Sequence, residues 1–525
     1  MDRRFDVAIV GFGPSGAVAA ALLGQAGLSV YVCDVATDVY DKPRAISLDH
    51  EVMRVFQQIG IADAVAPFVE PFTPSEYYGV DGQLIRRMTM IDEPYPLGHT
   101  PSMVFSQPSV ERVLREYVAS CAGVHTELGS SMVSFTQDAG SVTLLISDGS
   151  ANRYSINADW MIACDGASST TRSLLGIELE DLGFDEPWLV IDALVNDQGL
   201  AKLPATSVQY CEPQRPCSYL IGPGNHRRWE IALHAEEDPV EMASTDAAWR
   251  LLSRWISPND AELWRQASYR FHALVARDWR RNRVFIAGDA AHQQPPFLGQ
   301  GMCQGVRDVT NLCWKLAAVV RGEVSADAVE QLLDSYAVER RGHVRELTTR
   351  IKQVGAVICE HDVSAAKRRD AEMLKACDGV VTDTPRQDVM PSLTAGFLSN
   401  QHGSGRGTIF PQPQIVLGGD AVLLDEMTGA GWRLVTDGQL QIERSMLARF
   451  GAIPIVQLGG VGARGHGDVL AERDGVVASW MDRHRCHAAL VRPDHYVFGT
   501  AVGDAEMQVL LAEWSQYTSR SAQGA

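Results

Sequence analysis

Short apolar runs closed by glycine recur along this chain, separated by segments whose apolar residues repeat every three or four positions. The first run, residues 6–10, leads into Gly11-Phe12-Gly13-Pro14-Ser15-Gly16 and then into an alanine-rich stretch over 14–26. A second apolar run at 29–33 ends at Asp34. Continuous apolar runs indicate strands buried on both faces, so this pattern predicts a βαβ unit with parallel strands.

The same periodicities place further elements. Residues 48–60 carry their apolar positions on one helical face, and Gln107-Pro108-Ser109 has the composition of a helix start. From about residue 180 to 275 apolar and polar positions alternate, as is typical of an antiparallel sheet. The other predicted elements are strands at 131–135, 142–147, 153–156, 158–164, 188–195, 207–211, 218–222 and 228–232, and helices at 244–256 and 336–376.

A linker rich in Gly, Ser, Asn and Pro, residues 398–414, precedes a final α/β unit with strands near 431–435 and 453–458 and a hairpin at 488–498. A chain of 525 residues exceeds the size of one core, which favours two or three domains. We predict an α/β protein with an antiparallel sheet inserted into a Rossmann-like domain. The predicted divisions are a Rossmann-like domain (1–75, 101–178 and 275–345), an inserted substrate-binding domain (76–100 and 179–274), a helical connection (346–397) and a C-terminal domain (398–525).

Charge and composition narrow the classes of partner. The formal net charge of −19 argues against nucleic acid, and an anionic substrate would need a locally basic pocket. No apolar run approaches the length of a membrane span, and the run after Arg3-Arg4 is too short for a signal peptide. The ten cysteines are scattered without a CxxC or zinc-finger spacing. We therefore expect a reduced, cytoplasmic protein without a metal site.

The glycines of the first turn have separate roles in a dinucleotide site. Gly11 suits the tight turn, Gly13 the close approach of backbone to a pyrophosphate, and Gly16 the packing of the helix. Asp34, at the end of the second strand, is placed to accept hydrogen bonds from an adenosine ribose.

A second segment, roughly 280 residues later, indicates which dinucleotide binds. An apolar strand ends at Gly288-Asp289 and presents a carboxylate. A turn at Pro295-Pro296, followed by Gly299 and Gly301, lets backbone N–H groups approach an anionic or electron-rich ring before a helix begins. The two segments together predict an FAD site.

Three further positions fit that site, although each also has an ordinary interpretation. Asp165-Gly166 could be a strand-end turn, Arg44 a solvated cation and Gln107 a cap residue. Because the two glycine-rich segments are also present, we predict that Asp165 is part of the dinucleotide site. We also predict that Arg44 binds the pyrophosphate and that Gln107 forms a hydrogen bond near the flavin. A second glycine pattern, residues 460–465, lacks the following acidic strand and is predicted to be a surface loop.

Two histidines stand beside carboxylates and are candidates for proton transfer. Asp49 with His50 is the first pair, and His292 near Asp289 is the second. The alternative is that His50 lies on a helix surface and His292 packs within a turn. The hydrolase and kinase motifs GxSxG, HExxH and the P-loop are absent from the sequence.

These motifs resemble those of the class A flavoprotein aromatic hydroxylases over essentially the whole chain. The run from Gly288 to Asp308, with residues 311–316, is similar to the branch that contains 3-(3-hydroxyphenyl)propionate hydroxylase, as are residues 43–51 and 228–230. Residues 490–497 resemble the end of that branch's thioredoxin-like C-terminal domain. Since this chain has no CxxC there, disulfide exchange is not supported.

The resemblance implies FAD, NAD(P)H and O₂ as reactants: NAD(P)H reduces the flavin, O₂ forms a C4a-hydroperoxide, and its distal oxygen is transferred to a phenol ring. Some relatives have a polar base near the position of Ile46, so the base here is expected to be Asp49 with His50 or a residue of the inserted sheet. Side chains of that sheet expected to line the pocket include Tyr77, Tyr78, Tyr219, Trp229 and His272.

The favoured function is hydroxylation of a phenolic compound such as 3-(3-hydroxyphenyl)propionate. The same chemistry on a larger aromatic natural product or antibiotic, or a flavoprotein reductase without oxygenation, remain alternatives. The choice between NADH and NADPH, the regiochemistry and the formation of a homodimer stay open. A halogenase would be expected to show a Trp-x-Trp-x-Ile-Pro segment, which the sequence lacks.

Overall fold

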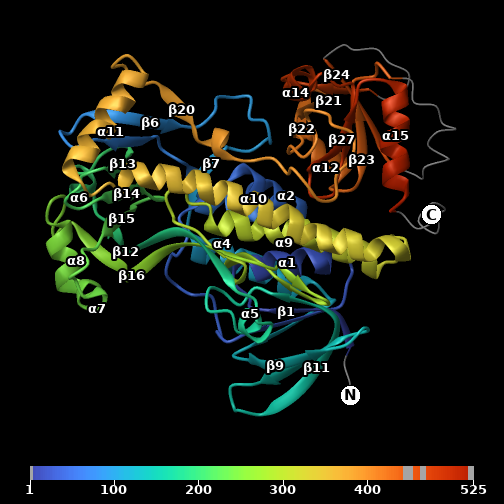
Figure 1. Ribbon diagram of the computed structural model, residues 1–525, viewed down its shortest axis with the longest axis horizontal. Helices are drawn as coiled ribbons and strands as arrows, with labels where there is room; N and C mark the ends of the chain where they lie inside the picture. The colour runs from blue at the N-terminus through green and yellow to red at the C-terminus, as the bar shows by residue number, and fades with distance from the viewer. Residues whose placement is uncertain (1–3, 441–452, 461–468, 518–525) are drawn as a thin grey trace.

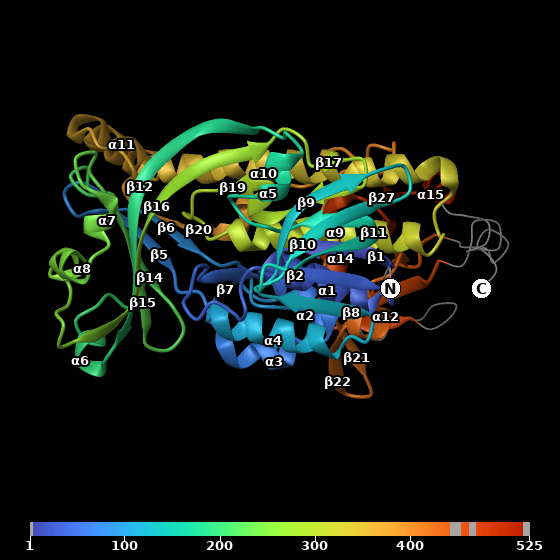
Figure 2. The same ribbon diagram turned by 90° about the horizontal axis from the view of Figure 1, so that it is seen from below.

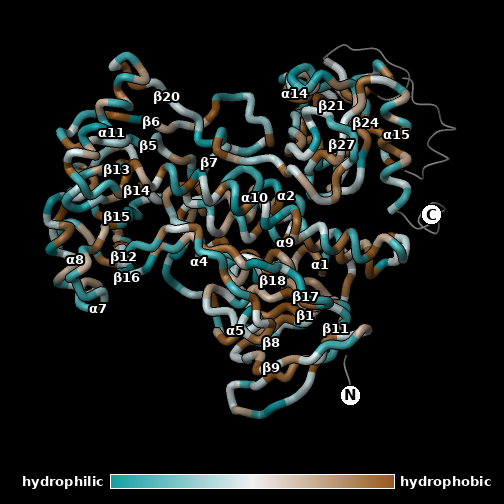
Figure 3. The backbone as a smooth tube through the Cα atoms, viewed as in Figure 1, coloured by the Kyte–Doolittle hydropathy of each residue, from teal (hydrophilic) through white to brown (hydrophobic). Residues whose placement is uncertain are grey.

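The predicted βαβ unit is the centre of an eight-stranded sheet in the computed structural model, which describes residues 4–440, 453–460 and 469–517. β1 (Arg4–Val10) lies parallel to β2 (Val30–Asp34) and β11 (Arg153–Ala163), and α1 (Pro14–Gln25) connects β1 to β2. β1 and the strands beside it are among the most hydrophobic segments of the chain (Figure 3). β1 is buried along most of its length, as its apolar run predicts, and α1 packs against β1 and β2.

The strands predicted at 153–156 and 158–164 are one strand, β11, which corrects that prediction. Asn157 interrupts the apolar pattern between them, but its side-chain oxygen accepts a 2.7 Å hydrogen bond from the Thr143 hydroxyl. Thr143 lies directly opposite on β10 (Val142–Ser147). Because the cross-strand bond satisfies the polar group, the strand continues through it.

A nine-stranded sheet forms the other end of this part of the molecule. Two long antiparallel strands, β12 (Leu179–Val195) and β16 (Ala261–Ala276), run toward that end (Figure 2). Within the described residues the order is β19-β16-β12-β15-β14-β13-β5-β6-β20. Four of these strands were predicted, and their bounds are β12, β13 (Ser207–Tyr210), β14 (Cys217–Ile221) and β15 (His226–Ala232).

Two helices pack between the sheets and the C-terminal unit (Figure 1). α9 (Gly301–Val320) packs against α1 and against α10 (Val329–Ile358). The helix predicted at 336–376 is two helices, α10 and α11 (Val363–Ala376), and the segment expected to be helical to residue 397 instead forms β20 (Asp383–Pro385) on the edge of the nine-stranded sheet. No helix among the described residues has the length and apolar content to cross a membrane.

The C-terminal unit has a seven-stranded sheet in the described residues, ordered β22-β21-β25-β24-β23-β26-β27. The predicted strands are confirmed as β23 (Arg433–Thr436) and β24 (Ile455–Gly460), and the hairpin as β26 (Ala488–Val491) with β27 (Val497–Ala501). Residues 461–468, which hold most of the predicted glycine loop, lie outside the described residues.

The remaining strands and helices complete the three sheets described above, a further three-stranded sheet of β3, β7 and β4, and the covering layers. Their bounds are β3 (Ser47–Asp49), α2 (His50–Ile59), α3 (Ala62–Val65), β4 (Val69–Pro71), β5 (Ser75–Tyr78), β6 (Leu84–Thr89), β7 (Ser102–Phe105), α4 (Gln107–Ser120), β8 (Val124–Leu128), β9 (Ser131–Gln137), α5 (Thr170–Leu174), α6 (Asp197–Leu200), α7 (Pro239–Met242), α8 (Thr245–Leu252), β17 (Arg280–Arg281), β18 (Val284–Ile286), β19 (His292–Gln293), β21 (Gln414–Leu417), β22 (Asp420–Leu423), α12 (Leu424–Thr428), β25 (Leu470–Glu472), α14 (Val476–His484) and α15 (Asp504–Ser515).

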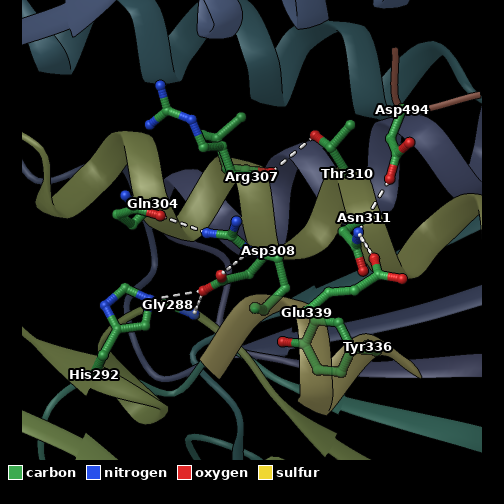
Figure 4. Close-up of polar contacts among 12 residues, drawn as sticks. Gly288, His292, Gln304, Arg307, Asp308, Thr310, Asn311, Tyr336, Glu339 and Asp494 are labelled. Atoms are coloured by element: carbon green, nitrogen blue, oxygen red, sulfur yellow. Dashed lines mark hydrogen bonds and ion pairs between the residues drawn. The ribbon is translucent and has the colours of Figure 1, made fainter. Parts of the chain in front are cut away.

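Buried ions join the C-terminal unit to α9 and α10. Glu339 of α10 pairs with Arg492 of the β26–β27 turn at 2.7 Å and with Lys315 of α9 at 2.9 Å. Asn311 of α9 donates to Glu339 and to Asp494, as Figure 4 shows. Burial alone would raise the pKa of Glu339, but Arg492 and Lys315 lower it to about 2. The carboxylate is therefore ionised and paired at neutral pH.

We expect Arg492→Gln to lower the free energy of unfolding by about 3–5 kcal/mol, because removing one partner of a buried pair leaves the other charge uncompensated. Acid unfolding should also move to higher pH, because stability from a carboxyl with a lowered pKa is lost as pH falls from 4.5 toward 2. Denaturant titration at several pH values measures both. Arg473→Gln, at an exposed ion pair of the same unit, is the control and should cost under about 1 kcal/mol; equal losses in the two variants would contradict the prediction.

Candidate active site

One cavity of about 620 Å³ extends from the start of α1 to the inner face of the nine-stranded sheet. Gly13 and Ser15 line one end, and Glu230, on β15, lines the other. This volume lies within the range of small-molecule sites in proteins. Both predicted sites, for the dinucleotide and for the substrate, therefore open into one space.

At the first end, α1 begins without a side-chain cap, and Gly13, Pro14 and Ser15 line the cavity. Gly13 occupies the cap position, so the helix presents its first N–H groups and the positive end of its dipole. Gly16 does not line the cavity; a side chain there would clash with the carbonyl of Gly11. The arrangement suits a pyrophosphate.

Asp34 lies behind this turn. One oxygen of its carboxylate accepts a hydrogen bond from the Phe12 N–H at 2.5 Å, and the other accepts from the Ala36 N–H at 2.7 Å. Asp34 thereby holds the glycine turn against the end of β2. Each oxygen retains a second lone pair for a further donor.

Gln107 and Arg44 form another part of the wall. The side-chain oxygen of Gln107 accepts from the backbone N–H groups of Arg44, at 3.0 Å, and Ala45, at 2.7 Å. The carbonyl of Arg44 accepts a bond from Arg228 at 2.8 Å. The backbone that carries Arg44 is thus fixed from two sides, and its guanidinium lies 5.0 Å from the centroid of the Tyr40 ring.

The Gly288 turn is held by Asp308, a residue to which sequence reasoning assigned no role. The Asp308 carboxylate accepts from the Gly288 N–H at 3.0 Å and from His292 at 2.7 Å, and it pairs with Arg340 of α10 at 2.9 Å (Figure 4). His292 also stacks on Trp279 and is fully buried, so it supports the turn and does not reach the cavity. The sequence did contain one sign of this role, because Asp308 is a charged residue on the buried face of α9.

The residues after that turn do line the cavity: Asp289, Pro296, Gly299 and Gly301. The Asp289 side chain is exposed to the cavity, and the enclosing protein still raises the pKa of its carboxyl. Asp165 does not line it; it accepts from Ser169 and from the Thr171 N–H and so orders the turn that presents Gly166.

Asp49 and His50 do not line the cavity, so the structure does not bring the predicted proton-transfer pair to it. Asp49 caps α2 and pairs with Arg307 of α9 at 2.5 Å, where Arg307 also pairs with Glu51 at 2.9 Å. Burial lowers the pKa of His50 and keeps its imidazole neutral. Ile46, in contrast, does line the cavity and offers no titratable group.

The substrate end is formed by side chains of the nine-stranded sheet that lie opposite one another. Gln209, Ser218, Glu230 and Val190 are cross-strand neighbours on β13, β14, β15 and β12, and all four line the cavity. Because neighbours in a strand point to opposite faces, Trp229 lies in the core behind the sheet.

Of the five sheet side chains expected at the pocket, only His272 lines it. Tyr77, Tyr219 and Trp229 are buried in hydrophobic clusters, and Tyr78 packs against one of them. The aromatic residues that do line the cavity are Tyr269, Phe271 and Phe297. Phe271 and Phe297 belong to an edge-to-face cluster with Trp188, so this wall is rigid and apolar.

Arg386, which sequence reasoning missed, is a buried cation on the cavity wall. Its guanidinium lies 4.2 Å from the ring of Phe72 and donates to the carbonyl of Leu298 at 3.0 Å. In the described part of the chain it forms no ion pair with a carboxylate, and its Nε has no hydrogen-bond partner. Burial accordingly lowers its pKa, although Arg386 stays protonated.

Residues 4–351 match the family model described as "FAD binding domain", and residues 407–515 match "HcaD C-terminal domain". The chain belongs to the FAD-binding domain family. It is 35% identical over 519 residues to a probable NADH-specific resorcinol 4-hydroxylase of Rhodococcus jostii, covering 97% of this chain and 94% of the relative. A 3-(3-hydroxy-phenyl)propionate/3-hydroxycinnamic acid hydroxylase of Burkholderia vietnamiensis is 32% identical, with 94% and 93% covered.

Solved structures show the same fold. The flavin-dependent monooxygenase PieE with FAD and substrate superposes with a TM-score of 0.80 at 21% identity, covering 98% of this chain and 99% of that one. Aklavinone-11 hydroxylase with FAD and aklavinone gives a TM-score of 0.78 at 19% identity, with 98% and 99% covered. The chain is thus an FAD-dependent aromatic hydroxylase with NAD(P)H as co-substrate.

We expect Asp308→Asn to lower the free energy of unfolding by about 3 kcal/mol or more, because it leaves the buried Arg340 guanidinium without its carboxylate. Urea titration measures the loss. The control is Asp334→Asn on the exposed face of α10, where the pair with Arg280 should contribute under about 1 kcal/mol. A loss no larger in Asp308→Asn than in the control would show that Asp308 does not hold the turn.

Proposed function

We propose that this hydroxylase acts on a phenol that carries a carboxylate, of the 3-(3-hydroxyphenyl)propionate type. The observation that carries the proposal is Arg386: a buried guanidinium on the cavity wall with no carboxylate partner among the described residues. Burying a charge without a partner is costly, so a substrate anion is the group that would complete the site. On a protein of net charge −19, such a cation is also what an anionic substrate requires.

Arg228 and Arg265, which line the cavity with Glu230, lie beside the carboxylate of Asp192, whereas Arg386 has no such neighbour among the described ion pairs. Arg228 pairs with Asp192 through two hydrogen bonds of 2.7 and 3.1 Å. Arg265 lies 3.9 Å from the same carboxylate and donates to the carbonyl of Pro43. A neutral diphenol such as resorcinol, the compound in the name of the Rhodococcus relative, would leave Arg386 unpaired.

For the cofactor, we propose that Gly11, Gly13 and Gly16 shape the pyrophosphate turn and that Asp34 accepts from the adenosine ribose. This is supported by the uncapped start of α1 at the cavity. Arg44, held by Gln107, would face the pyrophosphate, and Asp289 with the Pro296–Gly301 backbone would lie along the flavin end. Gly288 and Asp165 would act by shaping the turns beside it. The flavin held there would activate O₂, which supplies the oxygen atom added to the substrate.

The protein's own contribution is to orient the phenol and to exclude water. Phe271 and Phe297 provide an apolar wall against which an aromatic ring can pack. Arg386 would fix one end of the substrate, and polar groups of β14 and β15 would contact the other. Enclosure of the reacting ring limits loss of the activated oxygen to water.

We also propose that residues 398–525 form a thioredoxin-like domain and that the nine-stranded sheet is the inserted substrate domain. The first proposal is supported by the strand order β24-β23-β26-β27, with β23 and β24 parallel and β26 and β27 antiparallel. The second is supported by β5 and β6, which join that sheet although β6 ends 90 positions before β12 begins.

The proposed function is tested by NADH and NADPH oxidation with FAD-loaded enzyme, with products identified by mass. The panel contains 3-(3-hydroxyphenyl)propionate, 3-ethylphenol and resorcinol. A gain of one oxygen on the carboxylate compound, at the lowest KM of the three, is expected. Preference for either uncharged phenol would contradict the proposal, and coenzyme oxidation with no oxygenated product from any aromatic compound would favour a reductase.

We expect Arg386→Gln to raise the KM for 3-(3-hydroxyphenyl)propionate by about 100-fold, because truncating one partner of a buried charge pair costs about 2–5 kcal/mol. The KM for 3-ethylphenol should change by less than about threefold. Arg87→Gln, at a partly exposed arginine of β6, is the matched control and should alter neither value. Equal effects of Arg386→Gln on both phenols would contradict a role in binding the carboxylate.

We expect Asp289→Ala to give a folded protein that retains well under one FAD per chain, because a polar contact at the flavin end is lost. Flavin absorbance after gel filtration measures occupancy, and circular dichroism checks the fold. Asp278→Ala, an exposed residue shortly before the same strand, should keep the wild-type flavin content. Full occupancy in Asp289→Ala would remove Asp289 from the cofactor site.

A further inference from the structure

Glu230 is a carboxyl group inside the cavity without a hydrogen-bond partner. It lies on β15, is buried within the protein and lines the cavity. Among the described residues, no donor reaches its oxygens within hydrogen-bond distance; Arg228 lies nearest among the cations, at 3.9 Å. A buried carboxyl is normally satisfied by the protein, so this one is available to a ligand.

The charges around Glu230 explain why it remains available. All three guanidinium nitrogens of Arg228 are engaged, by Asp192 and by the carbonyls of Pro43 and Arg44. Asp192 on β12 is further paired with His226 at 2.8 Å, and Arg265 of β16 lies 3.9 Å from it. The nearby cations therefore lie closer to Asp192 than to Glu230. The negative charge of Asp192 in turn opposes ionisation of Glu230.

The remaining neighbours of Glu230 in the sheet are uncharged. Ser218 lies opposite it on β14 and donates to Gln209 at 2.5 Å, and Val190 lies opposite on β12. Burial, with the help of Asp192 and against Arg228, raises the pKa of Glu230 to about 7. At neutral pH both the acid and its conjugate base are populated, which is the condition under which a general base works well.

We propose that Glu230 is the base that accepts the phenolic proton of the substrate. In the step, the O–H bond of the phenol breaks, its electron pair stays on the phenolic oxygen, and the proton bonds to a carboxylate oxygen of Glu230. Glu230 becomes neutral and the substrate becomes a phenolate, whose ring carbons ortho and para to the oxygen gain electron density. This inference rests on the proposed function and assigns its proton acceptor to the nine-stranded sheet instead of to Asp49 and His50.

The arrangement also orients the substrate. Arg386 lies near Tyr77 of β5, and Tyr77 is the cross-strand neighbour of Gln209. Glu230 lies two strands beyond Gln209, so Gln209 and Ser218 separate Glu230 from the strand beside which Arg386 lies. A phenol with a carboxylate on a short chain would place its acidic end at Arg386 and its hydroxyl at Glu230.

The test compares Glu230→Gln with wild type over pH 6 to 9, using 3-(3-hydroxyphenyl)propionate and resorcinol as probes. The wild-type kcat should rise through pH 7 and then level off, since Glu230 must be ionised to accept the proton. Glu230→Gln should lose about 100-fold in kcat at pH 7, within the usual contribution of a general base. Its rate should then increase about tenfold per pH unit, because free phenols have a pKa of about 10.

Two further variants separate a chemical role from a structural one. Glu230→Asp retains a carboxyl and should recover part of the rate and the levelling of the profile. Glu262→Gln, an exposed glutamate of the same sheet, should behave as wild type. Flavin content should be unchanged in all three, and substrate-free NADH oxidation should be unchanged in Glu262→Gln. The absorbance of bound phenolate at pH 7.5 should be present in wild type and absent in Glu230→Gln.

A Glu230→Gln enzyme with the wild-type pH profile and bound-phenolate absorbance would overturn the assignment of Glu230 while leaving the proposed function intact. A wild type that binds FAD but yields no hydroxylated product from any phenol would overturn both.

Discussion

The buried carboxylate of Asp308 is the contact on which the cavity depends. Asp308 lies on α9 and binds Gly288, His292 and Arg340 at once, so it joins α9 to the segment 288–292 and to α10. Gly288, with φ near +60°, packs closely against Ser15 at the start of α1, so the two glycine-rich turns share one support. Because an unpaired charge in this interior would be costly, α9, α10 and the turn are held in one relative position. The walls of the cavity follow from that position.

The protein is acidic overall, yet several arginines line or adjoin its cavity. Arg228, Arg265, His226 and Asp192 form a nearly self-contained group, in which Asp192 is kept ionised by Arg228 and His226 although burial opposes it. Arg386 and Glu230 also line the cavity, and among the described residues neither has a partner of opposite charge at hydrogen-bond distance. One is a cation and the other a carboxyl with a near-neutral pKa, which together suit a substrate with one anionic and one acidic end.

Buried ion pairs attach the C-terminal unit to the rest of the molecule, as they do the Gly288 turn of the cavity wall. Glu339, Lys315 and Arg492 form a buried network between α9, α10 and the β26–β27 turn. A second network joins Arg54 of α2 to Asp425 and Arg433. Since each network would leave unpaired buried charges if the unit separated, the unit stabilises the two helices on which the Gly288 turn is built.

The sequence by itself determined most of the elements, the cofactor class and the residues that shape the glycine turns, because these depend on local spacing and backbone conformation; it divided β11 in two and joined α10 to α11. Gly11, Gly13 and Gly16 could be assigned from a pattern six residues long. The sequence could not determine which charged residues share a partner: Asp49 beside His50 looked like a catalytic pair, yet Asp49 is bound to Arg307, which lies 258 positions away. Glu230 and Arg386 carry no local signal. Only the tertiary structure decided that both line the cavity without an ion-pair partner at hydrogen-bond distance among the described residues. Pairing of buried charges depends on which strands and helices meet and not on the order of residues along the chain.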